Sequence, residues 1–247
     1  MTVRKLVALF DTHVPYQIPL GGVFKFIKDF KPDTIVLGGD MHDWESVCHW
    51  VADQSRALDG GTITENYKEL HEVLLDPLHK VAPNANKVYL TGNHEVWLQM
   101  AASLCPNGRG YWELDRNIDF KKYNMRILPV NVPYQASRHL YLMHGMYVNK
   151  YHAEHTVSTF QRSVMYGHTH DVQEFTIVSP LDVKQSHKGK SCGCLCHRNP
   201  HYMKNKPNRW VNGFNYVYID EKDGHFWENQ VYIIDNEFIA DGHFYKA

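Results

Sequence analysis

The chain has 247 residues, a length that fits one large domain and leaves little room for two. Hydrophobic residues make up 43% and charged residues 21%, which is ordinary for a globular protein. The net charge of −1 produces no overall field that would attract nucleic acid or an anionic membrane surface. The 17 histidines are unusual, and because histidine is the commonest metal ligand they favour a metal site.

The N-terminal segment lacks the features of a secretion signal. Its apolar run, Leu6–Phe10, is too short and ends at Asp11. Nowhere does the sequence contain an apolar stretch long enough to span a bilayer. We therefore expect no membrane segment and a cytoplasmic location. In that compartment the five cysteines are expected to be reduced thiols or metal ligands.

Apolar strands and amphipathic helices alternate along the first two thirds of the chain. The predicted strands are Val3–Phe10, Thr34–Leu37, Lys87–Leu90, His139–Met143 and Ser163–Tyr166. The predicted helices are Val23–Phe30, Asn66–Val81, Glu95–Leu104 and Tyr151–Phe160. Strands are then predicted at Gly213–Ile219, Glu228–Ile234 and Glu237–Phe244. This order predicts a layered α/β fold with helices covering a sheet, in a single domain over residues 1–247.

Polar side chains follow five of these strands, at the point where each strand ends. The segments are Asp11-Thr12-His13, Gly38–Asp43, Gly92–Glu95, His144-Gly145 and Gly167–His170. Ligands of open α/β sheets bind outside the carboxyl ends of the strands, so these side chains are expected to meet at one rim. Carboxylates and imidazoles suit Mn²⁺, Fe, Zn²⁺ or Ni²⁺. A carboxylate can also bridge two ions about 3.5–4 Å apart, the separation used for displacement at phosphorus.

These segments resemble, in order, the D-x-H, G-D-x-x-D, G-N-H-[D/E], H and G-H-x-H blocks of the calcineurin-like metallophosphoesterase superfamily. The five blocks span Asp11–His170, about two thirds of the chain. The resemblance implies a layered β-sandwich flanked by helices, with a dinuclear metal site at the carboxyl ends of the strands. It also implies hydrolysis of a phosphate ester by a hydroxide that bridges two divalent ions, with Mn²⁺ preferred. The C-terminal part of the chain further resembles phage-encoded members.

The resemblance also assigns roles to individual residues. The first ion is expected to be held by Asp11, His13, Asp40 and His170. The second is expected to be held by Asp40, Asn93, His144 and His168, with Asp40 as the bridge. His94 is expected to protonate the leaving oxygen, and Asp43 to orient His94. Glu95 is expected to be a helix-start acid, and His42 is left outside the ligand set.

The substrate class is less constrained. In the serine/threonine protein phosphatases of this superfamily an arginine follows the second aspartate, whereas here Asp43 is followed by Trp44-Glu45. A phosphodiesterase or nuclease acting on nucleic acid or nucleotides is therefore favoured, and a phosphomonoesterase is the alternative. A non-catalytic binding module is disfavoured, because such a protein would be expected to have lost a ligand or His94. The aromatic residues between Asp43 and Trp50 either stack a nucleobase or pack in a loop.

A basic segment follows the last block. Residues 183–219 contain no Asp or Glu and seven Lys or Arg, and we interpret 183–212 as an insertion and 213–245 as C-terminal strands. Lys204, Lys206 and Arg209, interleaved with Tyr202 and Trp210, are candidate contacts to a phosphate backbone. The alternative is a solvated insertion with no partner.

The same segment contains three cysteines in alternation: Cys192, Cys194 and Cys196. If the segment is a strand, their side chains share one face. They are then either small buried thiols or, with His197 or His201, ligands of a structural zinc.

Overall fold

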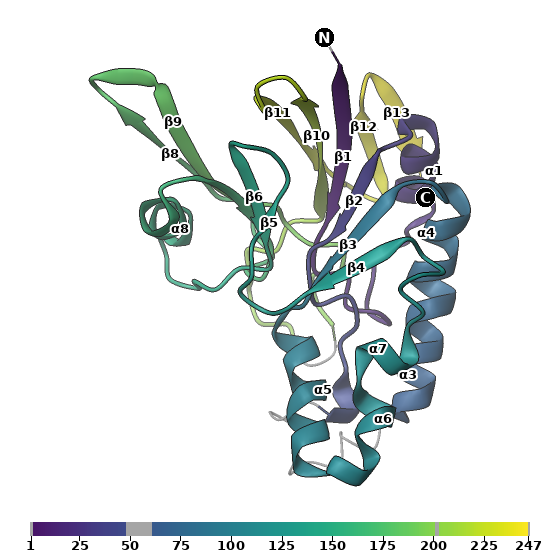
Figure 1. Ribbon diagram of the computed structural model, residues 1–247. Helices are drawn as coiled ribbons and strands as arrows, with labels where there is room; N and C mark the ends of the chain where they lie inside the picture. Colours follow the sequence, from purple (N-terminus) through teal and green to yellow (C-terminus); the bar gives the residue numbers. More distant parts are fainter. Residues whose placement is uncertain (1, 48–60, 201–202, 247) are drawn as a thin grey trace.

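The computed structural model describes residues 2–47, 61–200 and 203–246. Two β-sheets face each other, and helices cover the outer faces (Figure 1). The six-stranded sheet has the order β11-β10-β1-β2-β3-β4. Its strands are β1 (Val3–Leu9), β2 (Thr34–Leu37), β3 (Asn86–Leu90), β4 (Met125–Leu128), β10 (Gly213–Asp220) and β11 (Phe226–Tyr232). The strands β1 to β4 are parallel, and β10 and β11 run antiparallel to their neighbours.

The second sheet has five strands in the order β5-β6-β7-β9-β8. Its strands are β5 (Tyr134–Gln135), β6 (Leu140–Met143), β7 (Ser163–Tyr166), β8 (Glu174–Ser179) and β9 (Asp182–Ser191). The strands β6, β7 and β9 are parallel. A separate hairpin of β12 (Glu237–Ala240) and β13 (His243–Lys246) packs near helix α1 (Gly21–Phe30).

The remaining helices lie mainly on the outer face of the six-stranded sheet and below it in Figure 1. They are η1 (Glu45–Val47), α3 (Ile63–Leu70), η3 (His71–Leu75), α4 (Asp76–Val81), α5 (Asn93–Leu104), η4 (Pro106–Gly108), α6 (Arg109–Trp112) and α7 (Leu114–Asn117). Helix α8 (His152–Phe160) covers the second sheet instead. None of the helices in the described ranges is long and apolar enough to cross a membrane.

Strand β1 shows why the sheets and helices form layers. Leu6 and Ala8 point to one face and belong to the core between the two sheets, with Leu140 and Leu142 of β6. Val7, on the opposite face, belongs to the core beneath the helices. Alternate residues of a strand face opposite sides, so a continuous apolar run is required when both faces are buried. The expected sandwich flanked by helices is therefore confirmed, while the single domain stays a prediction.

Three segments differ from what the sequence pattern predicted. The predicted strand Glu237–Phe244 is instead two strands of an antiparallel hairpin, β12 and β13, because the chain turns at Asp241-Gly242. The predicted helix Asn66–Val81 begins earlier, at Ile63, where Thr62 and Glu65 form a capping box, and a π-helical turn interrupts it. The first half of the predicted basic insertion is strand β9, which is hydrogen-bonded between β7 and β8. The sequence of β9 is mostly charged and polar, so a search for apolar strands does not detect it.

Candidate metal centre

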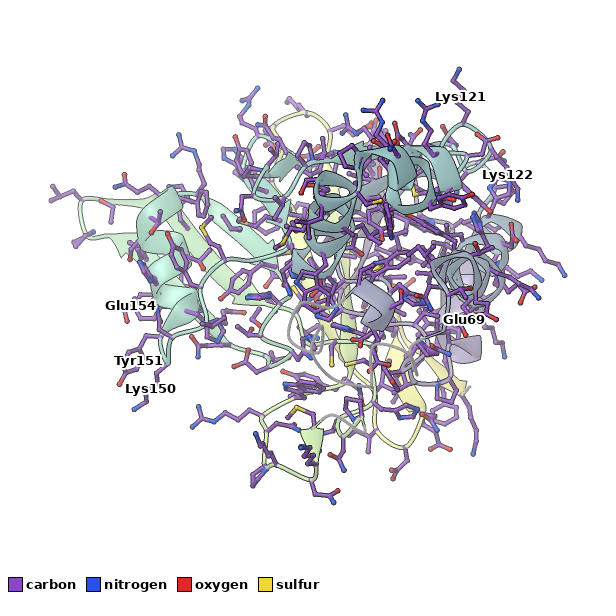
Figure 2. The ribbon with its side chains drawn as sticks, turned by 90° about the horizontal axis from the view of Figure 1, so that it is seen from below. Glu69, Lys121, Lys122, Lys150, Tyr151 and Glu154 are labelled. Carbon is purple, nitrogen blue, oxygen red and sulfur yellow. The ribbon has the colours of Figure 1, made fainter. Side chains whose placement is uncertain are left out.

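The carboxyl ends of the central strands meet at one end of the sandwich, the lower end in Figure 1. Pairing keeps these ends level, because Leu9 of β1 aligns with Leu37 of β2, and Met143 of β6 aligns with Tyr166 of β7. Figure 2 views the molecule from this end, with Lys150 and Tyr151 to one side and Glu69 to the other. The polar residues after each strand are therefore brought to a common rim.

Seven side chains predicted as ligands come together at this rim. Asp11, His13 and His170 offer ligand atoms that lie within 4.8 Å of one another, and so do Asp40, His144 and His168. The seventh, Asn93, places its Oδ1 3.0 Å from His144 Nε2.

Asp40 lies between the two groups. Its Oδ2 is 3.3 Å from His144 Nε2 and 3.9 Å from His13 Nε2. The two candidate groups therefore lie side by side, with the Asp40 carboxylate near histidines of both.

The backbone at the rim adopts conformations that side-chain-bearing residues seldom occupy. Five of the seven candidate ligands have positive φ: Asp11 at 50°, His13 at 48°, Asp40 at 52°, His168 at 69° and His170 at 59°. Left-handed residues other than glycine are uncommon and tend to gather at functional sites, where the surrounding structure stabilises them. The rim is therefore held in a conformation that aims these side chains at one another.

Two glycines permit the close approach of the loops. A Cβ atom on Gly92 would collide with the carboxylate of Asp40, and a Cβ on Gly167 would collide with that of Asp11. Because these glycines have no Cβ, the backbone can approach the two carboxylates closely. The N–H of His168, for example, donates to Asp11 Oδ2 at 2.8 Å. The glycines of the motifs are therefore required by packing around the two aspartates.

Glu95 supports the rim from below. It is fully buried, and its carboxylate accepts hydrogen bonds from the backbone N–H groups of Asp40, Met41 and Gly92 at 2.8–3.1 Å. The hydroxyl of Tyr89 donates to it as well, at 2.8 Å. Glu95 does lie in the first turn of helix α5, but it also ties the Asp40 loop to that helix. This second role was missed at the sequence level.

Substitution of Glu95 by alanine is expected to destabilise the protein by about 3 kcal/mol or more, because four buried donors lose their acceptor. Urea unfolding of metal-free protein measures this. Glu65 is a matched control, because it occupies the same capping-box position in α3 but is exposed. Equal losses for Glu65→Ala and Glu95→Ala would contradict the supporting role.

The chemistry of the rim fits cations. Asp11 Oδ1 is buried and has no hydrogen-bond partner within the described ranges, and it faces His170 Nε2 at 3.4 Å. His13 Nε2 and His170 Nε2 lie only 3.2 Å apart. Burial acts to raise the pKa of Asp40, but His144 and His94 outweigh it and hold that pKa well below its usual value. Ionised carboxylates and convergent ring nitrogens are a suitable donor set for divalent transition metals.

When metal is absent, protons bind to the ring nitrogens of the candidate ligands His13 and His144. Burial acts to lower the pKa of His13 and His144, but Asp43 raises the former to about 9 and Asp40 raises the latter to about 10. Both pKa values lie above the ordinary histidine value of 6.5. Protonation of His13 and His144 therefore stabilises the metal-free fold fully below pH 6.5, and this stabilisation is lost as the pH rises to about 9–10.

Metal binding near pH 7.5 is therefore expected to release about two protons per chain, and apparent metal affinity should rise with pH up to about 10. Calorimetric titration in buffers of different ionisation enthalpy measures the number released. Affinity that is independent of pH between 6.5 and 9 would show that these histidines do not hold the metal.

His94 lies beside the two ligand groups. Its Nδ1 lies 2.7 Å from the carbonyl oxygen of Asp43, and its Nε2 lies 3.9 Å from Asp40 Oδ2. A carbonyl only accepts, so Nδ1 carries a proton and Nε2 faces the metal side. The ring packs against Trp97 with centroids 3.9 Å apart. This geometry directs Nε2 of His94 toward the Asp40 carboxylate.

The position of Asp43 modifies its predicted role. Its backbone carbonyl orients His94, but its carboxylate Oδ1 lies 2.8 Å from His13 Nδ1 and 3.6 Å from His94 Nδ1. The carboxylate therefore serves mainly the candidate ligand His13, leaving His13 Nε2 free for a metal. The sequence could not distinguish a backbone contact from a side-chain contact at this residue.

We expect Asp43→Ala to weaken metal affinity by roughly 10–100-fold, as is usual when the partner of a ligating histidine is removed. Turnover at saturating metal should change much less, because the Asp43 carbonyl still accepts from His94. Asp43→Asn, which keeps an oxygen for His13, should be milder. Activity measured across a metal titration separates the two effects. A large loss of turnover at saturating metal would show that the carboxylate acts through His94.

The basic residues of the segment predicted to contact substrate differ in their surroundings: some are exposed and others form ion pairs. Lys204, Lys206 and Arg209 are exposed on the loop that leads to Trp210, whose ring lies 4.2 Å from that of His170. Lys188 and Lys190 of the same basic segment are instead paired with Glu174 and Glu228 on neighbouring strands. Two of its seven positive charges are therefore neutralised.

The aromatic residues after Asp43 are not a stacking surface where the structure describes them. Trp44 is fully buried, with its ring 4.4 Å from His42 and 4.9 Å from Tyr67. It belongs to the core beneath the helices, and its backbone is left-handed, with φ of 53°. Trp50 and Tyr202 lie outside the described residues.

The three alternating cysteines do not share the face of a strand, because β9 ends at Ser191. Cys194 and Cys196 are buried with Sγ atoms 3.6 Å apart, and Cys196 Sγ lies 3.7 Å from His170 Nδ1. Cys192 is buried and separate from this group. His197 is exposed and His201 lies outside the described residues. Cys196 of this pair thus contacts the candidate metal ligand His170 through the ring nitrogen Nδ1. A structural zinc with His197 or His201 stays a prediction.

Fold and rim together define a metal-dependent phosphoester hydrolase. The family model of the calcineurin-like phosphoesterases matches residues 7–218, and the chain belongs to this family. It is 24% identical over 258 residues to "Gene 54 protein" of Mycobacterium phage D29, and 23% identical to its counterpart in phage L5, covering 99% of both chains in each case. The expected similarity to phage-encoded proteins is confirmed.

Among solved structures, the chain is similar to Vps29 of Entamoeba histolytica complexed with Zn²⁺. The identity is 14% and the TM-score 0.45, covering 97% of this chain and 95% of the other.

Proposed function

We propose that this protein is a dinuclear phosphodiesterase that acts on nucleic acid or a nucleotide. The observation that carries the proposal is the convergence of seven candidate metal ligands, with Asp40 near histidines of both groups. Asp11, His13, Asp40 and His170 would hold one ion, and Asp40, Asn93, His144 and His168 the other. The ions, with Mn²⁺ the favoured identity, would supply a hydroxide nucleophile and neutralise charge at phosphorus.

The chain's own residues would protonate the leaving group and keep the two candidate ligand groups in position. His94 receives a proton at Nε2 from solvent and delivers it to the leaving oxygen, while the Asp43 carbonyl fixes its ring. Trp97 covers the ring and restricts its rotation. Glu95 and the glycines keep the loops at the separation that the two ligand groups require.

Two features favour a diester. An arginine after Asp43 would grip a monoester dianion, but this chain has Trp44 there, buried in the core. Three exposed cations lie on the loop that Trp210 connects to His170, where they can contact the backbone of a polymeric substrate.

The proposal is tested by comparing bis(p-nitrophenyl) phosphate with p-nitrophenyl phosphate in the presence of Mn²⁺. The diester should be hydrolysed faster. With single-stranded nucleic acid, each phosphate contacted by Lys or Arg should contribute about −0.7 to the log–log salt slope of affinity. A cyclic nucleotide should show a much flatter dependence.

Substitution of Lys204, Lys206 and Arg209 by alanine should flatten the salt slope for the polymer and leave the chromogenic diester nearly unaffected. The matched control replaces Lys25, Lys28 and Lys121, which are exposed elsewhere on the molecule. A preference for the monoester would favour the phosphomonoesterase alternative. An unchanged slope in the loop variant would remove the loop from the proposal.

A further inference from the structure

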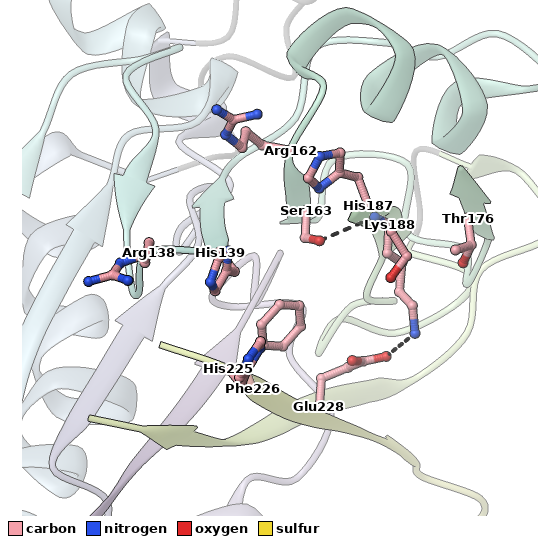
Figure 3. Close-up of a pocket in the computed structure, with 11 residues that line it drawn as sticks. Arg138, His139, Arg162, Ser163, Thr176, His187, Lys188, His225, Phe226 and Glu228 are labelled. Carbon is pink, nitrogen blue, oxygen red and sulfur yellow. Dashed lines mark hydrogen bonds and ion pairs between the residues drawn. The ribbon is translucent and has the colours of Figure 1, made fainter. Parts of the chain in front are cut away.

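A cavity lies at the amino ends of β6 and β7, the strands whose carboxyl ends lead to His144 and His168. The cavity has a volume of about 520 Å³ and is lined by residues of β6, β7, β8, β9 and β11 or next to them (Figure 3). Arg138 and His139 precede β6, and Arg162 precedes β7, whereas the candidate ligands follow these strands. Four strand residues at about 3.3 Å each separate the two ends, roughly 13 Å. The cavity is therefore distinct from the metal centre.

The lining carries a net positive charge, which comes from its two arginines. Three side chains carry permanent positive charge, Arg138, Arg162 and Lys188, and the one acidic side chain is Glu228. Glu228 is already engaged, because its Oε1 accepts from Lys188 Nζ at 2.7 Å (Figure 3). Within the described ranges neither arginine is paired with a carboxylate, and Arg162 donates only to the carbonyl of Gln161. Both arginines are exposed at the margin of the cavity, so their guanidinium groups are available to an incoming anion.

Three imidazoles complete this lining. The rings of His139 and His225 stack with centroids 5.2 Å apart and an interplanar angle of 15°. Burial, together with the nearby Arg162 and His139, lowers the pKa of His187 below its usual value. Positive charge thus already disfavours protonation of the third ring, as expected for a cavity with a positive potential.

We infer that this cavity binds the phosphate group of a small phosphorylated molecule. Guanidinium groups match the geometry of phosphate oxygens through paired N–H donors, and the volume suits a ligand of mononucleotide size. Phe226 supplies an apolar wall beside the stacked histidines, against which the remainder of such a ligand can pack. The inference does not depend on the reaction at the metal centre.

The test uses the full chain loaded with Zn²⁺, titrated with inorganic phosphate and, separately, with AMP. Binding is followed by calorimetry and by the imidazole NMR signals of His139, His187 and His225. A bound phosphate should raise the pKa of His187, because the anion stabilises the imidazolium. The double substitution Arg138→Gln/Arg162→Gln should lower affinity at this site at least about tenfold and abolish the pKa change.

The control variant is Lys25→Gln/Lys28→Gln, which removes the same charge from exposed positions of α1 and should bind like the wild type. Hydrolysis of the chromogenic diester should be unchanged in both variants, which separates this site from the metal centre. If Phe226→Leu weakens AMP but not inorganic phosphate, the ligand is a phosphate ester. If it weakens neither, the phosphate group alone is recognised. Unperturbed histidine signals, or an arginine double variant that binds like the wild type, would overturn the inference.

Discussion

Asp40→Asn should remove at least one of two metal ions and reduce turnover by roughly 10³-fold or more, since an ion contributes several kcal/mol to charge stabilisation at phosphorus. The reason is geometric, because Asp40 Oδ2 lies 3.3 Å from His144 Nε2 and 3.9 Å from His13 Nε2, closer to both rings than Asp11 Oδ1, which is 4.0 Å from each. Asparagine can still accept the hydrogen bond that His94 N–H donates to Asp40 Oδ1 at 2.9 Å, so the loop is preserved.

Metal analysis of protein prepared with Mn²⁺, together with anomalous scattering from crystals, measures the stoichiometry. Asp43→Ala is the matched control, because it removes a neighbouring buried carboxylate that contacts His13 from the side away from the metals. At saturating Mn²⁺ this control should retain both ions. Two ions retained by Asp40→Asn, or a wild-type stoichiometry of one, would contradict a bridged pair.

The second large effect is expected for His94→Ala, which should lower turnover by roughly 10²–10⁴-fold, the usual range for loss of a general acid. Metal content should not change, because His94 is grouped with His13 and Asp43 and belongs neither to the Asp11, His13, His170 group nor to the Asp40, His144, His168 group. Substrates with a p-nitrophenolate leaving group should be affected least, since they need little protonation. Diesters with an alkyl leaving group should be affected most.

His42→Ala is the control for loss of a nearby histidine. His42 is buried, but its Nε2 lies 3.3 Å from Glu69 and its Nδ1 accepts from the N–H of Trp44, so it faces away from the metal centre. This variant should lower the free energy of unfolding and leave turnover per folded molecule nearly unchanged. If His94→Ala strips the metals, or if both leaving groups slow equally, His94 is not the proton donor.

Much of the rim could be predicted from sequence because its determinants are local. Each polar block directly follows an apolar strand, as Asp11 follows β1 and Asn93 follows β3. Parallel neighbours then bring their carboxyl ends together, with Leu37 of β2 aligned to both Leu9 and Tyr89. Residue types at strand ends and the order of the strands are properties of the chain alone. The family and the convergence of seven candidate ligands follow from them.

The tertiary structure decided which atoms meet. The Asp43 carboxylate serves His13, while the Asp43 carbonyl serves His94, and both contacts depend on how the loop after β2 folds over α5. The Cys196 thiol reaches His170 only because the chain returns past the rim after β9. Strand β9 itself is a strand because β7 and β8 pair with it, despite its polar sequence. Such contacts join residues far apart in the chain, and only packing sets their distances. By itself, therefore, the sequence determined the kind of site and its ligand types, whereas the fold determined how each ligand is oriented and supported.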